Sequence, residues 1–301
     1  MKVFKFVAGL IIVAIAGIAF AQIVVDVPDE PARRTSDLKV EGCGYSRPLV
    51  VAGMIGNPPF GWVERHDETD SKQLESYGLG RMVLDKICDK LGISYVSTGF
   101  LSNDKATAAL KRGDIDLLLA AYYRPQDLGI GTSIITPGYF KNVFTVYFKK
   151  GQEIPVASLT DLAGWKGIIR REENIYPLLY PKLPKDIDLT QVAGAKRAFE
   201  MLMDGQADYL ITSPYAAEAE LRRYKLNEEI VPASFVLLDS TLFFVFTTNS
   251  DCWKLKERFS KALQGEDFSA PKVEEMARQL VDEWGERFRE QPGLTEKTSE
   301  E

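Results

Sequence analysis

Aromatic side chains gather at the ends of apolar, strand-like runs, where a binding surface would need them. The run "PLVVAGMI" is followed by "GNPPFGWVE", "IDLLLAA" by "YYRPQD", and "ADYLIT" by "SPYAA". Aromatic rings at strand ends provide flat apolar walls with polar tips, which suits capture of a small molecule. The alternative is that the same rings pack the interior or join two parts of the chain. The aromatic candidates are Phe60, Trp62, Tyr122, Tyr123 and Tyr215.

Arg124 adds a positive charge to the second of these turns. A guanidinium can grip a carboxylate, sulfonate or phosphate through two parallel hydrogen bonds. Pro125 restricts the backbone of Arg124 to extended conformations, so the turn is stiff. We expect Arg124 to recognise an anionic group of the ligand; the alternative is a surface arginine paired with Asp127.

The later half of the chain holds a second set of polar candidates. Arg170 ends the strand-like run "KGIIR", Glu172 follows it, and Ser213 follows "ADYLIT". With Glu64 and Glu173, Glu172 is a carboxylate that could serve acid–base catalysis, which needs a positioned titratable pair. None of these turns contains a histidine or a nucleophile motif. The residue types therefore favour binding over catalysis.

Strand-like and helix-like patterns alternate from residue 47 onward. "YGLGRMVLDKICDKLG" spaces its apolar residues at three and four and ends in Gly92, while "NDKATAALKRG" offers Asn103 as an N-cap. Short β-rich runs stand before, between and after these two segments. Alternation of this kind predicts an α/β fold in which helices flank parallel sheets.

The same order returns later, which predicts two lobes of related architecture. "LKRGDIDLLLAAYY" and "LMDGQADYLITSPY" share Leu, Gly, Asp and Tyr at matching positions, and Ser158 and Asp161 have capping-box spacing. The long alternating segments 141–153 and 240–250 would form a hinge between the lobes. Two amphipathic helices near the C-terminus would pack on the first lobe. Ligands bind beyond the carboxyl ends of strands in such folds, so the site should lie in the cleft between the lobes.

Length, charge and the N-terminus point to an exported globular protein. The 301 residues suffice for two cores, and a net charge of -6 disfavours nucleic acid or an anionic membrane as partner. Two lysines, an apolar run shorter than the roughly 20 residues of a membrane span, and "AFA" predict a cleaved signal peptide at 1–21. The alternative is an uncleaved anchor. We expect a polar leader at 22–46 and a disordered tail at 291–301.

Three cysteines cannot all pair within one chain. Cys43 and Cys88 would meet if the first helix packs back on the first strand, whereas the alternative is that these two and Cys252 are all reduced. The only histidine, His66, stands in the polar stretch "ERHDETDSK". We therefore expect neither a metal site nor a cofactor.

The order and spacing of several motifs resemble those of one protein family. They are "NPPFGW", "GLG" opening a helix that ends in "LG", "AALKRGDIDLLLAA", "TPGYF", "SLTDLAGWKG" and "GQADYLIT". With the N-terminal signal, they resemble the family 3 extracellular solute-binding proteins, the periplasmic receptors of polar amino-acid ABC importers. The resemblance covers roughly residues 47–285. It implies a periplasmic location and a two-lobe type II periplasmic-binding-protein fold, with lobe 1 at 47–142 and 240–290 and lobe 2 at 143–239.

The positions that recognise an α-amino acid in this family hold other residue types in this sequence. The resemblance places the family's carboxylate-binding arginine at Leu128 and its amino-binding acid at Ser213. Its Gly-Thr-Thr contacts fall on Glu172, Glu173 and Asn174. A buried charge of the ligand without a partner costs several kcal/mol. We therefore expect a ligand other than an ordinary α-amino acid.

These inferences predict a periplasmic receptor that passes a small-molecule solute to an ABC permease or reports it to a membrane sensor. We expect a monomer without enzymatic activity and without a nucleic-acid partner. Two alternatives stay open. One is an enzyme on the same scaffold, since cyclohexadienyl dehydratases resemble this family, and the other is a signalling module that binds no ligand.

Overall fold

A computed structural model describes residues 42–53, 55–65, 74–100, 102–122 and 131–288. All of them belong to one compact unit, Glu41–Glu301. The predicted signal peptide, most of the predicted leader and the predicted tail lie outside these residues. Among the residues described, helices are either too short or too polar to cross a membrane.

The described chain alternates strands and helices, as the sequence pattern predicts. The strands are β1 (Leu49–Ala52), β2 (Trp62–Arg65), β3 (Leu74–Tyr77), β4 (Tyr95–Thr98), β5 (Leu117–Tyr122), β6 (Thr132–Ile134), β7 (Phe140–Lys149), β8 (Lys166–Arg170), β9 (Asp188–Val192), β10 (Tyr209–Thr212) and β11 (Ile230–Thr247). The α-helices are α2 (Leu79–Leu91), α3 (Asn103–Arg112), α5 (Tyr176–Leu179), α6 (Ala195–Met203), α7 (Pro214–Tyr224), α8 (Lys256–Leu263) and α9 (Ala270–Arg287). Short 3-10 helices are η2 (Leu159–Leu162), η3 (Arg171–Glu173), η4 (Tyr180–Lys182), η5 (Asp251–Leu255) and η6 (Glu266–Phe268).

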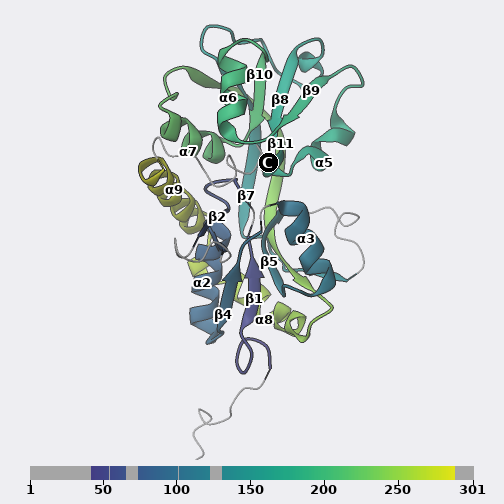
Figure 1. The fold of residues 1–301 in the computed structure, drawn as a ribbon, viewed down its shortest axis with the longest axis vertical. Helices are drawn as coiled ribbons and strands as arrows, with labels where there is room; N and C mark the ends of the chain where they lie inside the picture. The colour runs from purple at the N-terminus through teal and green to yellow at the C-terminus, as the bar shows by residue number, and fades with distance from the viewer. Residues whose placement is uncertain (1–41, 54, 66–73, 101, 123–130, 289–301) are drawn as a thin grey trace, which may run out of the picture. The chain divides into compact units, whose positions relative to one another are not determined.

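A nine-stranded mixed sheet explains how two lobes arise from one chain (Figure 1). β1 pairs in parallel with β4 and β5 in lobe 1, and β8 pairs in parallel with β9 and β10 in lobe 2. The antiparallel pair β7 and β11 joins the two groups, because β5 pairs with β11 and β10 with β7. The strand order is β4-β1-β5-β11-β7-β10-β8-β9, and β6 pairs with β11.

The long strands β7 and β11 run from one lobe into the other. Their register extends from the pair Phe140–Leu242 to the pair Lys149–Ile230. The predicted lobe boundaries fall inside these two strands, so the segments expected to form a hinge are continuous sheet. Whether the lobes move about them stays a prediction.

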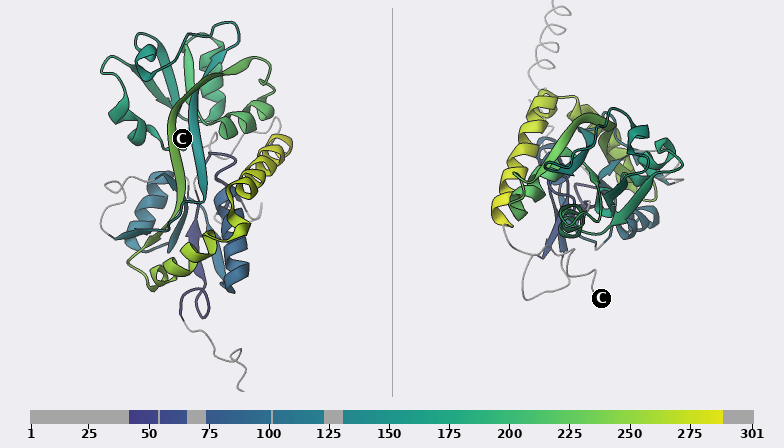
Figure 2. Two further views of the ribbon diagram at one scale, coloured as in Figure 1. Left: turned by 180° about the vertical axis from the view of Figure 1, so that it is seen from behind. Right: turned by 90° about the horizontal axis from the view of Figure 1, so that it is seen from above.

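Alternate residues of the lobe 1 strands face different helices, which builds a layered core. Val51 and Leu117 pack in the cluster that includes α2, whereas Ala52 and Leu118 pack in the cluster that includes α3. Successive side chains of a strand point to opposite faces, so strands buried on both faces are apolar throughout. Figure 2 shows helices on both sides of the sheet.

Sequence signals for helix ends are mostly confirmed. Gly92 and Gly113 end α2 and α3 in the left-handed conformation, and Ser158 with Asp161 forms a capping box. The prediction of Asn103 as N-cap is wrong by one residue. The Ser102 side chain accepts the hydrogen bond from the Lys105 amide, which makes Ser102 the cap and frees the Asn103 side chain.

The two C-terminal helices do not both stay on lobe 1. α8 packs on α2, as expected, but α9 packs most extensively on α7 of lobe 2 and also contacts α2 and β7. Close approach is possible because Gly285 lacks a side chain: a Cβ there would lie 3.0 Å from the Cβ of Arg222. The expectation that lobe 1 alone carries both helices is therefore wrong.

The disulfide joins Cys43 to Cys252, with a Cα–Cα distance of 5.1 Å, and Cys88 is a buried free thiol. Neither the Cys43–Cys88 pair nor three reduced cysteines is therefore correct. β11 returns the chain beside β5, which brings Cys252 to the start of β1, while Cys88 lies on the buried face of α2.

An ion pair reinforces the same end of lobe 1. Arg47 contacts both carboxylate oxygens of Asp116, at 2.8 and 3.2 Å, and one oxygen of Asp251 at 3.0 Å. Asp116 also accepts the Val50 amide. Burial alone would raise the pKa of Asp116, but hydrogen bonds from Arg47, Ser250 and the Val50 amide outweigh it and hold that pKa below its ordinary value.

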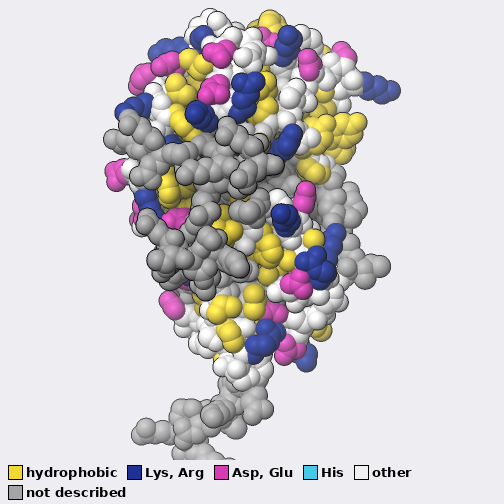
Figure 3. Space-filling model, in the orientation of Figure 1, with side chains coloured by type: hydrophobic (Ala, Val, Ile, Leu, Met, Phe, Trp, Pro, Cys, Tyr) yellow, Lys and Arg dark blue, Asp and Glu magenta, His cyan; other side chains and the backbone are white. Residues whose placement is uncertain are grey.

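Charges on the face drawn in Figure 3 are of both signs and interspersed. Lysine and arginine side chains alternate with aspartate and glutamate over both lobes, and apolar side chains lie between them. Among the described residues on this face, no large field of a single sign is seen.

Candidate ligand-binding cleft

The turn after β1 and the turn after β8 meet where the two lobes face each other. Arg170, the last residue of β8, donates from Nη1 to the carbonyl of Gly56 (3.4 Å) and from Nη2 to Oδ1 of Asn57 (3.2 Å). Asn103 of lobe 1 donates to the carbonyl of Glu172 in lobe 2 (3.2 Å). The carboxyl ends of β1 and β8 therefore lie together, which is where open α/β sheets bind ligands.

Arg170 and Glu173 form a buried ion pair at this junction. The Arg170 Nε lies 3.1 Å from the Glu173 carboxylate, and the side chains are 3% and 0% exposed. Burial alone would lower the pKa of Arg170, but the charges of Glu173 and Glu220 outweigh it and hold that pKa above its ordinary value. Burial raises the pKa of Glu173, and Arg170 opposes the rise. The guanidinium therefore stays charged and fixed in place.

Ser213 links this pair to the start of α7. Its amide donates to the second Glu173 oxygen (3.3 Å), and its hydroxyl accepts the Ala216 amide (3.1 Å) as the N-cap of α7. Ser213 is fully buried. The Ser213 hydroxyl therefore serves as the N-cap of α7.

Several buried polar atoms near this junction have no hydrogen-bond partner among the described residues. Three of them are Nδ2 of Asn57, Oδ1 of Asn142 and Oε2 of Glu172, whose other oxygen accepts the Gly194 amide (3.2 Å). Such atoms are few in folded proteins, and they mark positions where water or a ligand completes the bonding. The three come from the turn after β1, from β7 and from η3.

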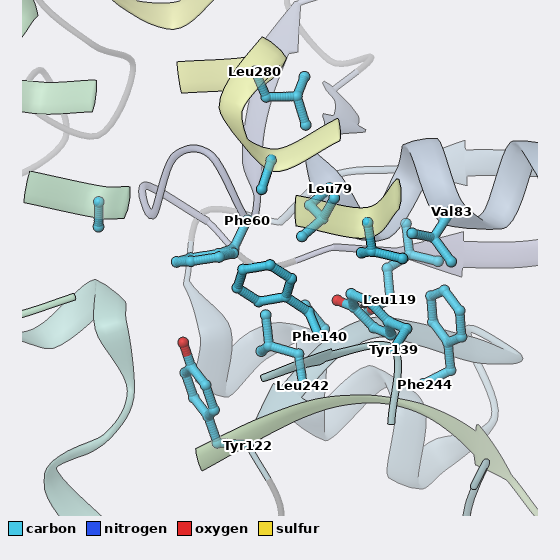
Figure 4. Packing of buried hydrophobic residues seen from close by; sticks show 14 of the residues in the cluster. Phe60, Leu79, Val83, Leu119, Tyr122, Tyr139, Phe140, Leu242, Phe244 and Leu280 are labelled. Atoms are coloured by element: carbon cyan, nitrogen blue, oxygen red, sulfur yellow. Dashed lines mark hydrogen bonds between the residues drawn. The ribbon is translucent and has the colours of Figure 1, made fainter. Parts of the chain in front are cut away.

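Phe60 and Tyr215 meet across the lobes through Phe140 of β7. The Phe140 ring lies 5.4 Å from that of Phe60 and 5.3 Å from that of Tyr215 (centroid distances). Figure 4 shows Phe60 beside Phe140 in the apolar cluster that also holds Leu242. Phe60 is buried, Tyr215 is half-buried, and Arg278 of α9 lies over the Tyr215 ring.

Trp62 and Tyr122 are packed by their own neighbours. The Trp62 ring stacks on Tyr77 and contacts Trp284 of α9 edge-on. The Tyr122 ring lies against Phe144, and burial raises the pKa of its hydroxyl, which accepts a hydrogen bond from Asn142 (2.8 Å). These contacts place Trp62 against α9 and Tyr122 against β7.

Two candidates lie outside the described residues. Tyr123 and Arg124, with the neighbouring Leu128 and Asp127, belong to the segment 123–130. Their roles stay predictions.

Three asparagines of the junction were missed by sequence reasoning. Asn57 opens the turn that carries Phe60, and the rule that selected aromatic residues at strand ends would have found it if extended to amides. Asn103 was assigned a capping role, which Ser102 takes instead. Asn142 lies within a strand, where no local signal marks it.

Comparisons with known proteins agree with the fold. No family model and no curated protein matches the sequence. An amino acid ABC transporter substrate-binding protein from Streptococcus pneumoniae, solved with L-arginine, has a TM-score of 0.61 and 18% identity, with 81% of this chain and 96% of that chain covered. The periplasmic VFT2 domain of BvgS from Bordetella pertussis has a TM-score of 0.60 and 19% identity, covering 77% and 92%. A histidine kinase sensor domain with similarity to periplasmic binding proteins gives 0.59 and 19%, covering 78% and 96%.

These structures have the two-lobe fold of periplasmic binding proteins, and this chain shares it. The fold implied by the sequence motifs is thus confirmed. The neighbours are binding and sensor proteins rather than enzymes. At identities below 20%, the likeness concerns the fold and leaves the ligand open.

Proposed function

We propose that this protein is an extracytoplasmic receptor that captures a small solute in the cleft between its lobes. The observation that carries the proposal is the set of buried polar groups at the facing strand ends. It combines a fixed ion pair with partnerless atoms on Asn57, Asn142 and Glu172. Buried polar atoms in a crevice of this fold suit a ligand that supplies the missing hydrogen bonds.

The proposed receptor works with a membrane partner. One structural neighbour is named for an ABC transporter and another for a histidine kinase. Delivery to an importer and presentation to a sensor both require a two-lobe form that holds the solute between its lobes. We propose that the chain reaches the periplasm through a signal peptide at 1–21, acts as a monomer, and catalyses no reaction.

The proposed lining combines aromatic walls with polar contacts. Phe60 and Tyr122 are buried, so a ligand reaches them only when the lobes separate, whereas Tyr215 is half-buried. The lining residues are Phe60, Trp62, Tyr122, Tyr123, Arg124, Arg170, Glu172, Ser213 and Tyr215.

The ligand is proposed not to be an ordinary α-amino acid. Arg170 and Glu173 are paired with each other, and the Ser213 hydroxyl caps α7, so these groups offer no free clamp for both charged ends of an amino acid. Submicromolar binding needs on the order of 8 kcal/mol. Bound ligand raises thermal stability, so a thermal-shift screen tests the class. A saturable shift with any of the twenty standard L-amino acids at micromolar concentration contradicts it.

Arg124 is proposed to hold the ligand's anionic group. A hydrogen bond to a charged group contributes about 1.5–3 kcal/mol, so Arg124→Ala should weaken binding of a ligand found in the screen roughly ten- to a hundredfold. Arg124→Lys should restore only part, because the planar fork is lost. Arg112→Ala is the matched control, since Arg112 is exposed and pairs with Asp114. Equal binding by wild type, Arg124→Ala and Arg112→Ala would assign Arg124 to the surface.

A further inference from the structure

Residues 170–173, which are the last residue of β8 and the 3-10 helix η3, form hydrogen bonds to lobe 1 beside the Phe60–Tyr215 ring contact. Glu173 holds the Arg170 Nε within lobe 2, so the two Nη groups are left to bind Gly56 and Asn57 of lobe 1. The guanidinium is planar, and fixing one edge of it fixes the direction of the other. The ion pair therefore orients the two Nη groups of Arg170 toward their acceptors in lobe 1.

Asn103 makes the second connection to η3. Its Oδ1 accepts the Ile55 amide (3.1 Å), which fastens the turn after β1, and its Nδ2 donates to the Glu172 carbonyl (3.2 Å). One side chain thus holds both the lobe 1 turn and the lobe 2 element. Asn57 is fully buried, and Asn103 is half-buried, so water competes weakly for these bonds.

α9 contacts both lobes at a second place, away from η3. Trp284 packs against Trp62 of lobe 1 and lies beneath the Arg223 guanidinium of lobe 2, 5.7 Å from the ring centroid. Arg222 of lobe 2 forms an ion pair with Asp282 of α9. Figures 1 and 2 show α9 on the opposite side of the long strands from α3. With the lobes also held together on the α9 side, opening on the α3 side requires Arg170 and η3 to separate from lobe 1.

We propose that the end of β8 and η3 form a built-in latch, made by Arg170, Glu172 and Glu173 on lobe 2 with Gly56, Asn57 and Asn103 on lobe 1. The latch keeps the lobes closed without any bound solute, because the chain itself supplies the bridging groups. The proposal does not depend on the proposed function, since the latch holds whether or not the cleft takes a ligand.

The distance between the lobes tests the latch directly. Spin labels at Lys105→Cys in α3 and Lys185→Cys after η4, both exposed positions, report it by double electron–electron resonance in a Cys88→Ala background. The protein is unfolded, freed of small molecules and refolded with its disulfide intact. The wild type should then show one narrow distance distribution. A broad distribution dominated by longer distances would overturn the proposal.

Variants of the latch should release the lobes. Asn57→Ala combined with Asn103→Ala removes two interlobe contacts but leaves the Arg170–Glu173 pair in place, and it should raise the ratio of long to short distances at least tenfold. Arg170→Lys keeps the charge but loses the fork, so it should act in the same direction with a smaller effect. Asn249→Ala, which removes a side-chain hydrogen bond within lobe 1, is the control and should match the wild type.

The double variant and Arg170→Lys can each refute the latch. If the double variant folds by circular dichroism and its distances equal those of the wild type, the latch is refuted. If the double variant does not fold, Arg170→Lys carries the test, and unchanged distances in it refute the latch equally. Because no solute is present in this measurement, its result is separate from that of the ligand screen.

Discussion

Two arginine–carboxylate pairs of this molecule differ in burial and in what they join. Arg47 and Asp116 lie at the start of β1 and β5, beside the disulfide, and the Arg47 side chain is 43% exposed. Arg170 and Glu173 lie at the opposite, carboxyl ends of strands and are almost completely buried. The first pair stays within lobe 1, whereas the second also binds across the lobes.

The two pairs lie at opposite ends of the parallel strands, and the proposed function gives a role only to the pair at the carboxyl ends. At the amino ends of strands, Arg47 closes the edge of a lobe and remains in contact with water. At the carboxyl ends, Arg170 lies at the junction of the lobes, where the proposed ligand site is. A buried pair costs desolvation, and an apolar replacement is often at least as stable. Retaining charge at that place is better explained by what it positions than by stability.

The largest expected effect is the loss of Glu173. Glu173→Gln removes the charged partner that contacts the buried Arg170 guanidinium, and breaking a buried pair in this way costs about 3–5 kcal/mol of the free energy of unfolding. Urea denaturation followed by circular dichroism measures it. The double variant Arg170→Met with Glu173→Met should recover most of the loss, because no charge is then left unpaired. A single variant within about 1 kcal/mol of the wild type would contradict the account of a fixed, charged pair.

The disulfide should matter for stability but not for the cleft. Removing Cys43–Cys252, which joins residues 209 positions apart, with serine substitutions should cost about 2–4 kcal/mol of the free energy of unfolding, the usual range for a disulfide. The interlobe distance distribution should stay that of the wild type, because the bond lies within lobe 1. Addition of a reductant to the variant serves as control and should change nothing further. A shifted distance distribution would show that this edge and the cleft are coupled.

A smaller and pH-dependent loss of the free energy of unfolding is expected for the substitution of Asp116. Its pKa in the folded state lies below the ordinary value of about 3.8. The ion pair therefore contributes fully above that pH, and its contribution is lost as the pH falls through the folded-state pKa. Asp116→Asn should lower the free energy of unfolding at pH 7 by about 1–2 kcal/mol, since Arg47 is partly exposed. Measured from pH 7 to pH 2, the variant should lose less stability on acidification than the wild type; an equal loss would contradict the assignment.

Most of the fold follows from local signals in the sequence. Apolar runs, helix-capping glycines and the repeated strand–helix order predict the two lobes and the sheet. The placement of α9 cannot be predicted from these signals, because an amphipathic pattern shows that one face of the helix is buried but not which element covers it. α9 packs closely on α7 because Gly285 has no side chain, which leaves room for Arg222 of α7. The disulfide was missed for a similar reason, since the return of β11 beside β5 is a property of the topology.

The candidate site was predicted less completely than the fold. The choice of strand ends selected Phe60, Tyr215 and Arg170, which lie at or near the junction of the lobes. The sequence pattern did not predict the ion pair between Arg170 and Glu173, because that pair depends on the direction of the Glu173 side chain in η3. Asn142 reaches the junction only through the register of β7, which is fixed by partners far along the chain.

Native mass spectrometry of the protein isolated from a periplasmic extract tests the receptor function most directly. We expect a single intact small molecule bound non-covalently at one per chain. Its mass should differ from those of the twenty standard amino acids, and it should be lost on unfolding and refolding. A bound molecule that is a conversion product of an added precursor would indicate an enzyme. Protein with an empty cleft in extracts from every growth condition would contradict the receptor and favour a signalling module without ligand.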